Sequence, residues 1–199
     1  ALVGLLFIVR LRISAIGAFL APVVTVVAGA SYSMTDSGHF VLAEPLRSVW
    51  LPIHVTLAFL GYALFVIAAS VSLVYLVQES RLKSKRPMSA AGSAAPSLEK
   101  LDRINYRLLI FGFGLLSLAI ISGAIWAEAT WGRFWTWEPK ESWALVLWIL
   151  YAALLQSRLT VGWRGRRAAA LTIAVFGVLV GSYLGVNLIA PGKHGGGFG

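Results

Sequence analysis

Residues 101–128 read LDRINYRLLIFGFGLLSLAIISGAIWAE, and no residue between Arg107 and Glu128 carries a charge. A helix needs about 20 predominantly apolar residues to cross the hydrocarbon core of a bilayer. This stretch therefore predicts a transmembrane helix over about residues 106–127, with polar groups at both of its ends.

Apolar runs of the same kind recur along the chain, which has 199 residues, 58% of them hydrophobic and only 13% charged. A soluble domain of this size has about a quarter charged residues. Residues 1–9 are apolar but too short to span, and they indicate part of a helix. We expect an all-α, polytopic membrane bundle with about five full spans plus a partial N-terminal helix. The further spans are predicted at 13–31, 51–78, 142–158 and 168–190.

The chain opens without a methionine. We therefore expect residues 1–199 to form one transmembrane domain that lacks its N-terminal part. Residues 79–105 are polar and rich in Ser, Ala and Pro, which predicts a flexible cytoplasmic linker. Gly177, Gly181 and Gly185 lie four apart, and this spacing predicts a small-residue strip for close helix packing.

Basic residues are distributed unequally between the two sides of the predicted bundle. One side has only Arg47, Arg133, Lys140 and Lys193. The other side has Arg10, Arg12, Arg81, Lys83, Lys85, Arg86, Lys100, Arg103, Arg107, Arg158, Arg164, Arg166 and Arg167. The positive-inside rule predicts that the second side is cytoplasmic. The net charge of +9 is thus mostly a signal of topology, and we expect no nucleic-acid partner.

A tryptophan-rich segment, residues 126–143, falls on the predicted outer side. Its sequence and the residues just after it include Trp126, Trp131, Trp135, Trp137, Trp143 and Trp148. An interfacial aromatic belt explains two or three tryptophans. The rest favour a flat apolar platform for a planar macrocycle, with Trp131, Trp135 and Trp137 lining the ring. Trp131 and Trp135 are four apart, so a short helix would place them on one face.

Charged residues and histidines accompany these tryptophans. Arg133 and Lys140 are candidates to pair with the propionates of a macrocycle. Glu138 and Glu141 are expected either to form ion pairs or to cap the following helix. The chain has no cysteine and three histidines, and histidine is a common ligand of haem iron. His54 and His194 flank the platform and are the candidate metal ligands, whereas His39 is interpreted as a solvated loop residue.

Several quoted stretches are similar to one known family. The run WGRFWTWEPKESWALVLWILYA, residues 131–152, resembles the WGxxWxWDPKExW signature of the haem-handling WWD proteins. Its Pro-Lys-Glu element points to the CcsA/ResC branch, the membrane subunit of the system II cytochrome c synthetase. The family's two segments with outer histidines resemble residues 50–65 and 162–194. The family's helix before the signature resembles residues 101–128.

The resemblance implies a function in cytochrome c maturation. Haem b (iron protoporphyrin IX) would be held at the outer face with His54 and His194 as axial ligands. It would then be attached through thioether bonds to an apocytochrome c bearing a Cys-x-x-Cys-His motif. A ResB/CcsB-like subunit would complete the synthetase, so whether this chain alone is an enzyme stays open, and no catalytic residue is assigned. The location implied is a bacterial plasma membrane or a thylakoid membrane, in contact with lipid.

Two positions depart from the family pattern. Glu138 stands where the family usually has Asp, and Gln156 stands where it commonly has an intramembrane histidine. The second departure puts the inner haem entry site in doubt. Two other interpretations stay open: a bis-His haem b electron-transfer subunit and a non-catalytic partner subunit of a membrane complex.

Overall fold

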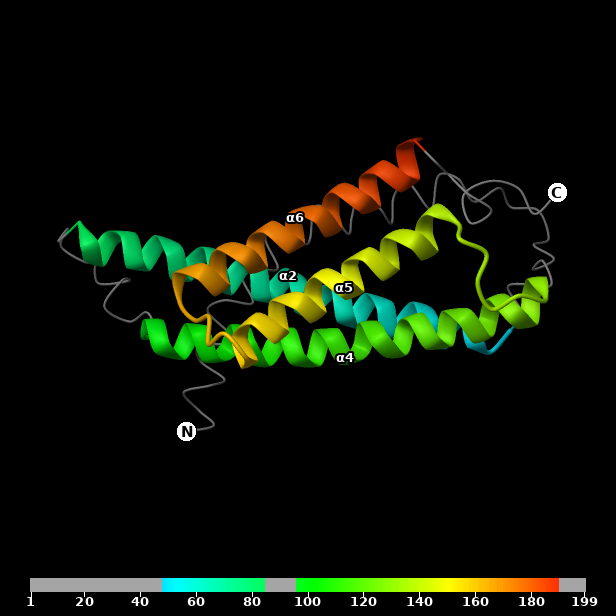
Figure 1. The fold of residues 1–199 in the computed structure, drawn as a ribbon, viewed down its shortest axis with the longest axis horizontal. Helices are drawn as coiled ribbons and strands as arrows, with labels where there is room; N and C mark the ends of the chain where they lie inside the picture. Colours follow the sequence, from blue (N-terminus) through cyan, green and yellow to red (C-terminus); the bar gives the residue numbers. More distant parts are fainter. Residues whose placement is uncertain (1–47, 85–95, 190–199) are drawn as a thin grey trace, which may run out of the picture. The chain divides into compact units, whose positions relative to one another are not determined.

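The computed structural model describes residues 48–84 and 96–189. These residues form the helices α2 (Trp50–Lys83), α4 (Leu98–Trp131), α5 (Pro139–Leu159) and α6 (Arg166–Ile189) (Figure 1). Each helix is long and apolar enough to cross a membrane. The spans predicted at 51–78, 106–127, 142–158 and 168–190 are thereby confirmed as membrane-length helices. The predicted span 13–31 and the partial helix 1–9 lie outside the described residues.

The two longest helices extend beyond the predicted spans. Helices α2 and α4 have 34 residues each, about 51 Å of helix, against a hydrocarbon core of about 30 Å. Residues 79–83 and 98–105, which we assigned to the linker, are helical. Polar side chains support these ends: Lys83 pairs with Glu79 at 2.8 Å, and the Ser97 hydroxyl caps α4 by accepting the Lys100 N–H at 3.3 Å. Only residues 84–97 lie between the two helices.

Helices α2 and α4 form the most extensive helix contact of the described residues, and glycines allow their close approach. A Cβ atom at Gly112 of α4 would lie 2.7 Å from the Phe65 ring of α2. Close packing was predicted instead at the α6 strip, but no described neighbour lies within 4 Å of the Cβ positions of Gly177, Gly181 or Gly185. Within the described helices, therefore, the small-residue contact is made by α2 and α4 and not by α6.

The core of the bundle lies where all four helices meet. Phe65 of α2 stacks on Tyr151 of α5, with 3.6 Å between ring centroids and 6° between ring planes. Both side chains are fully buried. The buried apolar cluster around this pair draws on α2, α4, α5 and α6, and its remaining members are Ala68, Leu109, Leu116, Leu147, Leu154, Leu155, Val175 and Leu179.

The two ends of the bundle differ in chemistry. At one end α2 and α5 finish while α4 and α6 begin, and Arg166 of α6 approaches Glu79 of α2 at 3.9 Å. We call this the basic end, because most of the Lys and Arg predicted as cytoplasmic belong to it. At the other end, the Trp-rich end, residues 132–138 connect α4 to α5, and α2 begins nearby (Figure 1).

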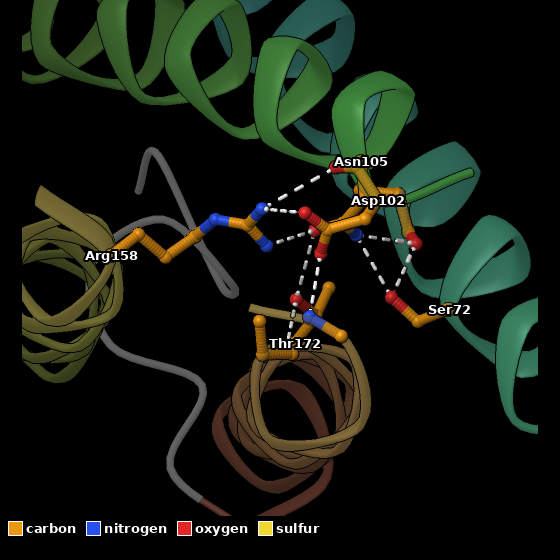
Figure 2. A network of polar contacts seen from close by, with 8 residues as sticks. Ser72, Asp102, Asn105, Arg158 and Thr172 are labelled. Carbon is orange, nitrogen blue, oxygen red and sulfur yellow. Dashed lines mark hydrogen bonds and ion pairs between the residues drawn. The ribbon is translucent and has the colours of Figure 1, made fainter. Parts of the chain in front are cut away.

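A buried polar network joins all four helices near the basic end (Figure 2). Arg158 of α5 donates to the Asp102 carboxylate of α4 at 2.7 Å, and its side chain is only 5% exposed. Asn105 of α4 accepts from Arg158 at 3.3 Å and donates to Ser72 of α2 at 2.8 Å. Thr172 of α6 also reaches Asn105, at 3.5 Å. Arg158 was counted among the basic residues of the predicted cytoplasmic side, and the structure shows that it is buried and paired with Asp102.

Candidate functional site

A cavity of about 370 Å³ opens at the Trp-rich end of the bundle. Sites for small molecules and cofactors commonly enclose about 300–1,000 Å³. All four helices and the α4–α5 connection contribute to its walls, which are mostly apolar. The lining residues include His54, Ala58 and Tyr62 of α2; Ala119, Gly123 and Trp126 of α4; Phe134 and Trp135 of the connection; Lys140, Glu141 and Trp143 of α5; and Tyr183 of α6.

His54 is the one predicted iron ligand within the described residues, and it lies on the cavity wall one turn into α2. Its Nδ1 atom is 2.7 Å from the carbonyl oxygen of Ala119 on α4. A carbonyl oxygen can only accept, so Nδ1 must carry the proton in this contact. In the neutral ring, Nε2 then keeps its lone pair and is the atom available to a metal. His39 and His194 lie outside the described residues.

The α4–α5 connection is organised by one carboxylate. Helix α4 ends at Trp131 and is capped by Gly132, whose φ of 66° is favourable for glycine. Glu141, in the first turn of α5, accepts the Thr136 N–H at 2.7 Å and the Glu138 N–H at 3.3 Å. Glu138, the N-cap residue, and Glu141 form a capping box at the start of α5, whose first residue is Pro139. Of the two roles expected for these carboxylates, capping of the following helix is confirmed.

The tryptophans are arranged differently from the prediction. Residues 132–138 are not helical, so Trp131 and Trp135 do not share one face of a short helix. The edge-to-face pairs are Trp126 with Trp131, at 4.9 Å, and Trp135 with Trp137, at 5.9 Å. The prediction failed because Gly132 ends α4 directly after Trp131.

Only some of the predicted site residues line the cavity. His54, Trp135, Lys140 and Glu141 do so. The other predicted site residues within the described part of the chain are not among its lining residues: Trp131, Arg133, Trp137 and Glu138. Arg133 and Trp137 are exposed, and Glu138 is buried in the connection.

Sequence reasoning missed other members of the wall. Trp126 and Trp143 stand at the two limits of the tryptophan-rich segment, yet they line the cavity in place of Trp131 and Trp137. Tyr62 was not considered at all. Its signal was present, because His54, Ala58 and Tyr62 are spaced by four residues and therefore share one face of α2.

The donor set of the cavity suits an anionic, largely apolar ligand better than a bare metal ion. Across residues 48–84 and 96–189, no three His, Cys, Asp or Glu side chains gather as a metal site. Lys140 contributes a cationic group to the lining, and the Glu141 carboxylate, which also lines the cavity, accepts the Thr136 and Glu138 N–H groups. The indole Nε1–H of Trp135 is buried and has no hydrogen-bond partner among the described residues. A buried donor without an acceptor is costly, at about 1–3 kcal/mol, and a bound acceptor would relieve that cost.

The site and the four helices of residues 48–84 and 96–189 define an integral membrane protein with a cofactor-sized cavity at one end of these helices. The chain belongs to the cytochrome c assembly protein family, whose model matches residues 1–194. It is similar to cytochrome c biogenesis proteins of the CcsA type, as the motif in residues 131–152 indicated.

Relatives with the name cytochrome c biogenesis protein CcsA come from cyanobacteria and an alga. The chain is 36% identical to that of Synechococcus sp. (strain CC9605) over 190 residues, which cover 84% of this chain and 62% of the relative. It is 38% identical to that of Guillardia theta over 167 residues, covering 77% and 56%. With that of Prochlorococcus marinus (strain NATL1A) it shares 39% identity over 177 residues, covering 77% and 56%. No solved structure matches the chain.

Proposed function

We propose that this protein binds haem in the cavity at the Trp-rich end and presents it for covalent attachment to apocytochromes c. The observation that carries the proposal is the pairing of His54 Nδ1 with the Ala119 carbonyl on the wall of a cofactor-sized cavity. This pairing leaves Nε2 of a neutral imidazole available to iron. Membership of the cytochrome c assembly family supports the same function.

The residues of the cavity fit haem in two respects. Its mostly apolar wall, with Phe134 and Trp135, suits the faces of a macrocycle, and Lys140 suits a propionate. Trp135 lines the cavity, and its buried Nε1–H has no acceptor among the described residues. Arg133 and Trp137, which were expected in the site, do not line the cavity, so their predicted contacts with haem find no support here.

His54 is proposed as one axial ligand and His194 as the other. Haem supplies the iron and the two vinyl groups to which the thiols of a Cys-x-x-Cys-His motif add. The chain has no cysteine, so both thiols must come from the apocytochrome. His54 lies near the first turn of α2, where an end of the helix borders the cavity. A ligand in this place is reached by an incoming histidine more readily than one deep in a span.

The chain spans 62% or less of the length of the relatives reported above. The thioether-forming synthetase activity and a ResB/CcsB-like partner are therefore proposed for the complete assembly. The predicted orientation places the Trp-rich end outside the cytoplasm, on the periplasmic, extracellular or lumenal side of the membrane.

Absorption spectra of the purified protein, oxidised and dithionite-reduced, test the proposal. Wild type is compared with His54→Ala, His194→Ala, the double variant and His39→Ala as the matched control. We expect low-spin haem b in wild type and in His39→Ala. Each of the other variants should become high-spin or lose haem, and added imidazole should restore the low-spin spectrum. Identical spectra for all five proteins would place the iron ligands elsewhere and favour an electron-transfer haem.

A further inference from the structure

Gly123 of α4 faces the imidazole of His54. A Cβ atom built at Gly123 would lie 2.7 Å from His54 Nδ1 and 2.8 Å from its Cε1. Real Cβ atoms essentially never approach other atoms within 3.0 Å. The His54 ring therefore occupies the space that a side chain at position 123 would need.

The ring is held by α4 through two neighbouring positions on one face. Ala119 and Gly123 are four residues apart, so they lie one above the other on the helix surface. The Ala119 carbonyl fixes Nδ1 at 2.7 Å, while the backbone of Gly123 passes close beside the same edge of the ring. Any movement of the imidazole away from position 123 would change the geometry of this short hydrogen bond.

Backbone conformation gives no other reason for glycine at this position. Gly123 lies inside α4, eight residues before the helix ends, and its φ is not among the positive values of the described glycines. Glycine in a helix interior costs about 1 kcal/mol relative to alanine. At position 123 the contact with His54 gives glycine a packing reason.

We propose that Gly123 and the Ala119 carbonyl form a seat that positions His54, with Nδ1 protonated and Nε2 presented to the cavity. Gly123 is thus a positioning residue that acts through His54. The inference rests on the proposed function, because it assumes that His54 ligates haem iron. Hydrogen bonds of this kind orient metal-binding histidines, and their loss typically costs about 10- to 100-fold in metal affinity or activity.

The test compares Gly123→Ala with Gly114→Ala. Both glycines lie in α4, but a Cβ atom at Gly114 meets nothing within 4 Å. Both substitutions raise helix propensity, so a general loss of helix stability is not expected from either. We expect Gly123→Ala to lower haem affinity about 10- to 100-fold and to convert the low-spin spectrum to high-spin, with recovery on adding imidazole. Gly114→Ala should keep the wild-type spectrum.

A second readout needs no haem. Nitrogen-15 NMR of histidine-labelled, haem-free protein reports which ring nitrogen carries the proton, and His54→Ala identifies the His54 signals. We expect a single Nδ1-protonated form in wild type and in Gly114→Ala, and a mixture of tautomers in Gly123→Ala.

The outcomes separate the seat from the proposed function. If His54→Ala changes the haem spectrum while Gly123→Ala changes neither the spectrum nor the tautomer, the seat is wrong and His54 ligation stands. If His54→Ala itself leaves the haem spectrum unchanged, the proposed ligation fails. The tautomer measurement on Gly123→Ala then still decides whether the seat exists.

Discussion

Trp137 adopts a backbone conformation that bulky residues rarely accept. Its φ is 58°, and its side chain is 70% exposed. The left-handed region costs a residue with a Cβ about 1–2 kcal/mol, whereas asparagine tolerates it better. Trp137 lies between Thr136 and Glu138, and the backbone N–H groups of both these residues bind Glu141. The capping box thus holds the turn that imposes this conformation.

Replacing Trp137 by asparagine or by valine separates the backbone effect from the ring. Both substitutions remove the edge-to-face contact with Trp135, so the loss of that contact cancels when the two variants are compared. We expect Trp137→Asn to be more stable than Trp137→Val by about 1–2 kcal/mol, measured by unfolding in detergent. Equal stabilities would show that the turn relaxes when the tryptophan is removed.

Trp135 gives a prediction with opposite signs for stability and binding. Trp135→Phe keeps an aromatic ring in the cavity wall but removes the buried Nε1–H that has no acceptor. The haem-free protein should keep or gain stability, by up to about 1–3 kcal/mol. Haem affinity should fall if that donor meets a propionate. Thermal unfolding and haem titration of the same samples check both signs, and unchanged affinity would remove Trp135 from propionate binding.

At the scale of elements, the start of α5 depends on Glu141. Glutamine at this capping position can still accept backbone N–H groups, whereas alanine cannot. We expect Glu141→Ala to destabilise the protein by about 0.5–2 kcal/mol, the usual range for loss of a cap. The connection that carries Trp135 should loosen, and Glu141→Gln should retain most of the wild-type stability. Unfolding in detergent measures both variants, and equal losses would mean that the charge of Glu141 matters more than its hydrogen bonds.

Hydropathy predicted the existence of α2, α4, α5 and α6, because a membrane span needs a long apolar run and little else. The internal arrangement of the Trp-rich segment was harder to predict. Its spacing favoured a short helix through Trp131 and Trp135, but Gly132 and Pro139 are the residues that end α4 and begin α5. Recognising Gly132 as a helix C-cap would have corrected the prediction from sequence alone.

The sequence alone could not predict which distant segments contact each other. Nothing local distinguishes Gly112 and Gly123, which let α2 approach α4, from Gly177 and Gly181, which face no described neighbour. The register between two helices decides which glycines meet a side chain, and register depends on the whole contact surface. The prediction that His54 and the Trp-rich segment lie at the same end of the bundle is confirmed. It needed only the number of spans between them, because successive spans cross the membrane in alternate directions.

At the scale of the whole molecule, the two ends of the bundle carry separate tasks. The polar network and the cavity are joined by α4, in which Asn105 and Ala119 are fourteen residues apart, about 21 Å along the axis. The network fixes the helices at the basic end, through Arg158 and Asp102. The cavity at the Trp-rich end should therefore tolerate changes in the network, provided that the bundle stays folded.

Breaking the buried pair from one side should be costly. Arg158→Met leaves the Asp102 carboxylate without its cation in a largely buried place, and such losses cost about 3–5 kcal/mol. The matched control is Arg103→Met, because Arg103 is 65% exposed and pairs loosely with Glu99 at 3.6 Å. Exposed pairs contribute about 0–1 kcal/mol, so the control should unfold close to wild type.

The double variant Arg158→Met/Asp102→Leu distinguishes an unpaired charge from lost packing. Removing both charges should recover part of the stability. Recovery should be incomplete, because Asp102 also accepts the Gly165 N–H at 3.0 Å. Unfolding in detergent gives the stabilities, and the spectrum of haem-loaded protein shows whether the distant cavity responds. If the stability loss of the double variant equals the sum of the losses in Arg158→Met and Asp102→Leu alone, the two side chains act independently. A low-spin spectrum lost in the double variant would instead show that the basic end helps to shape the cavity.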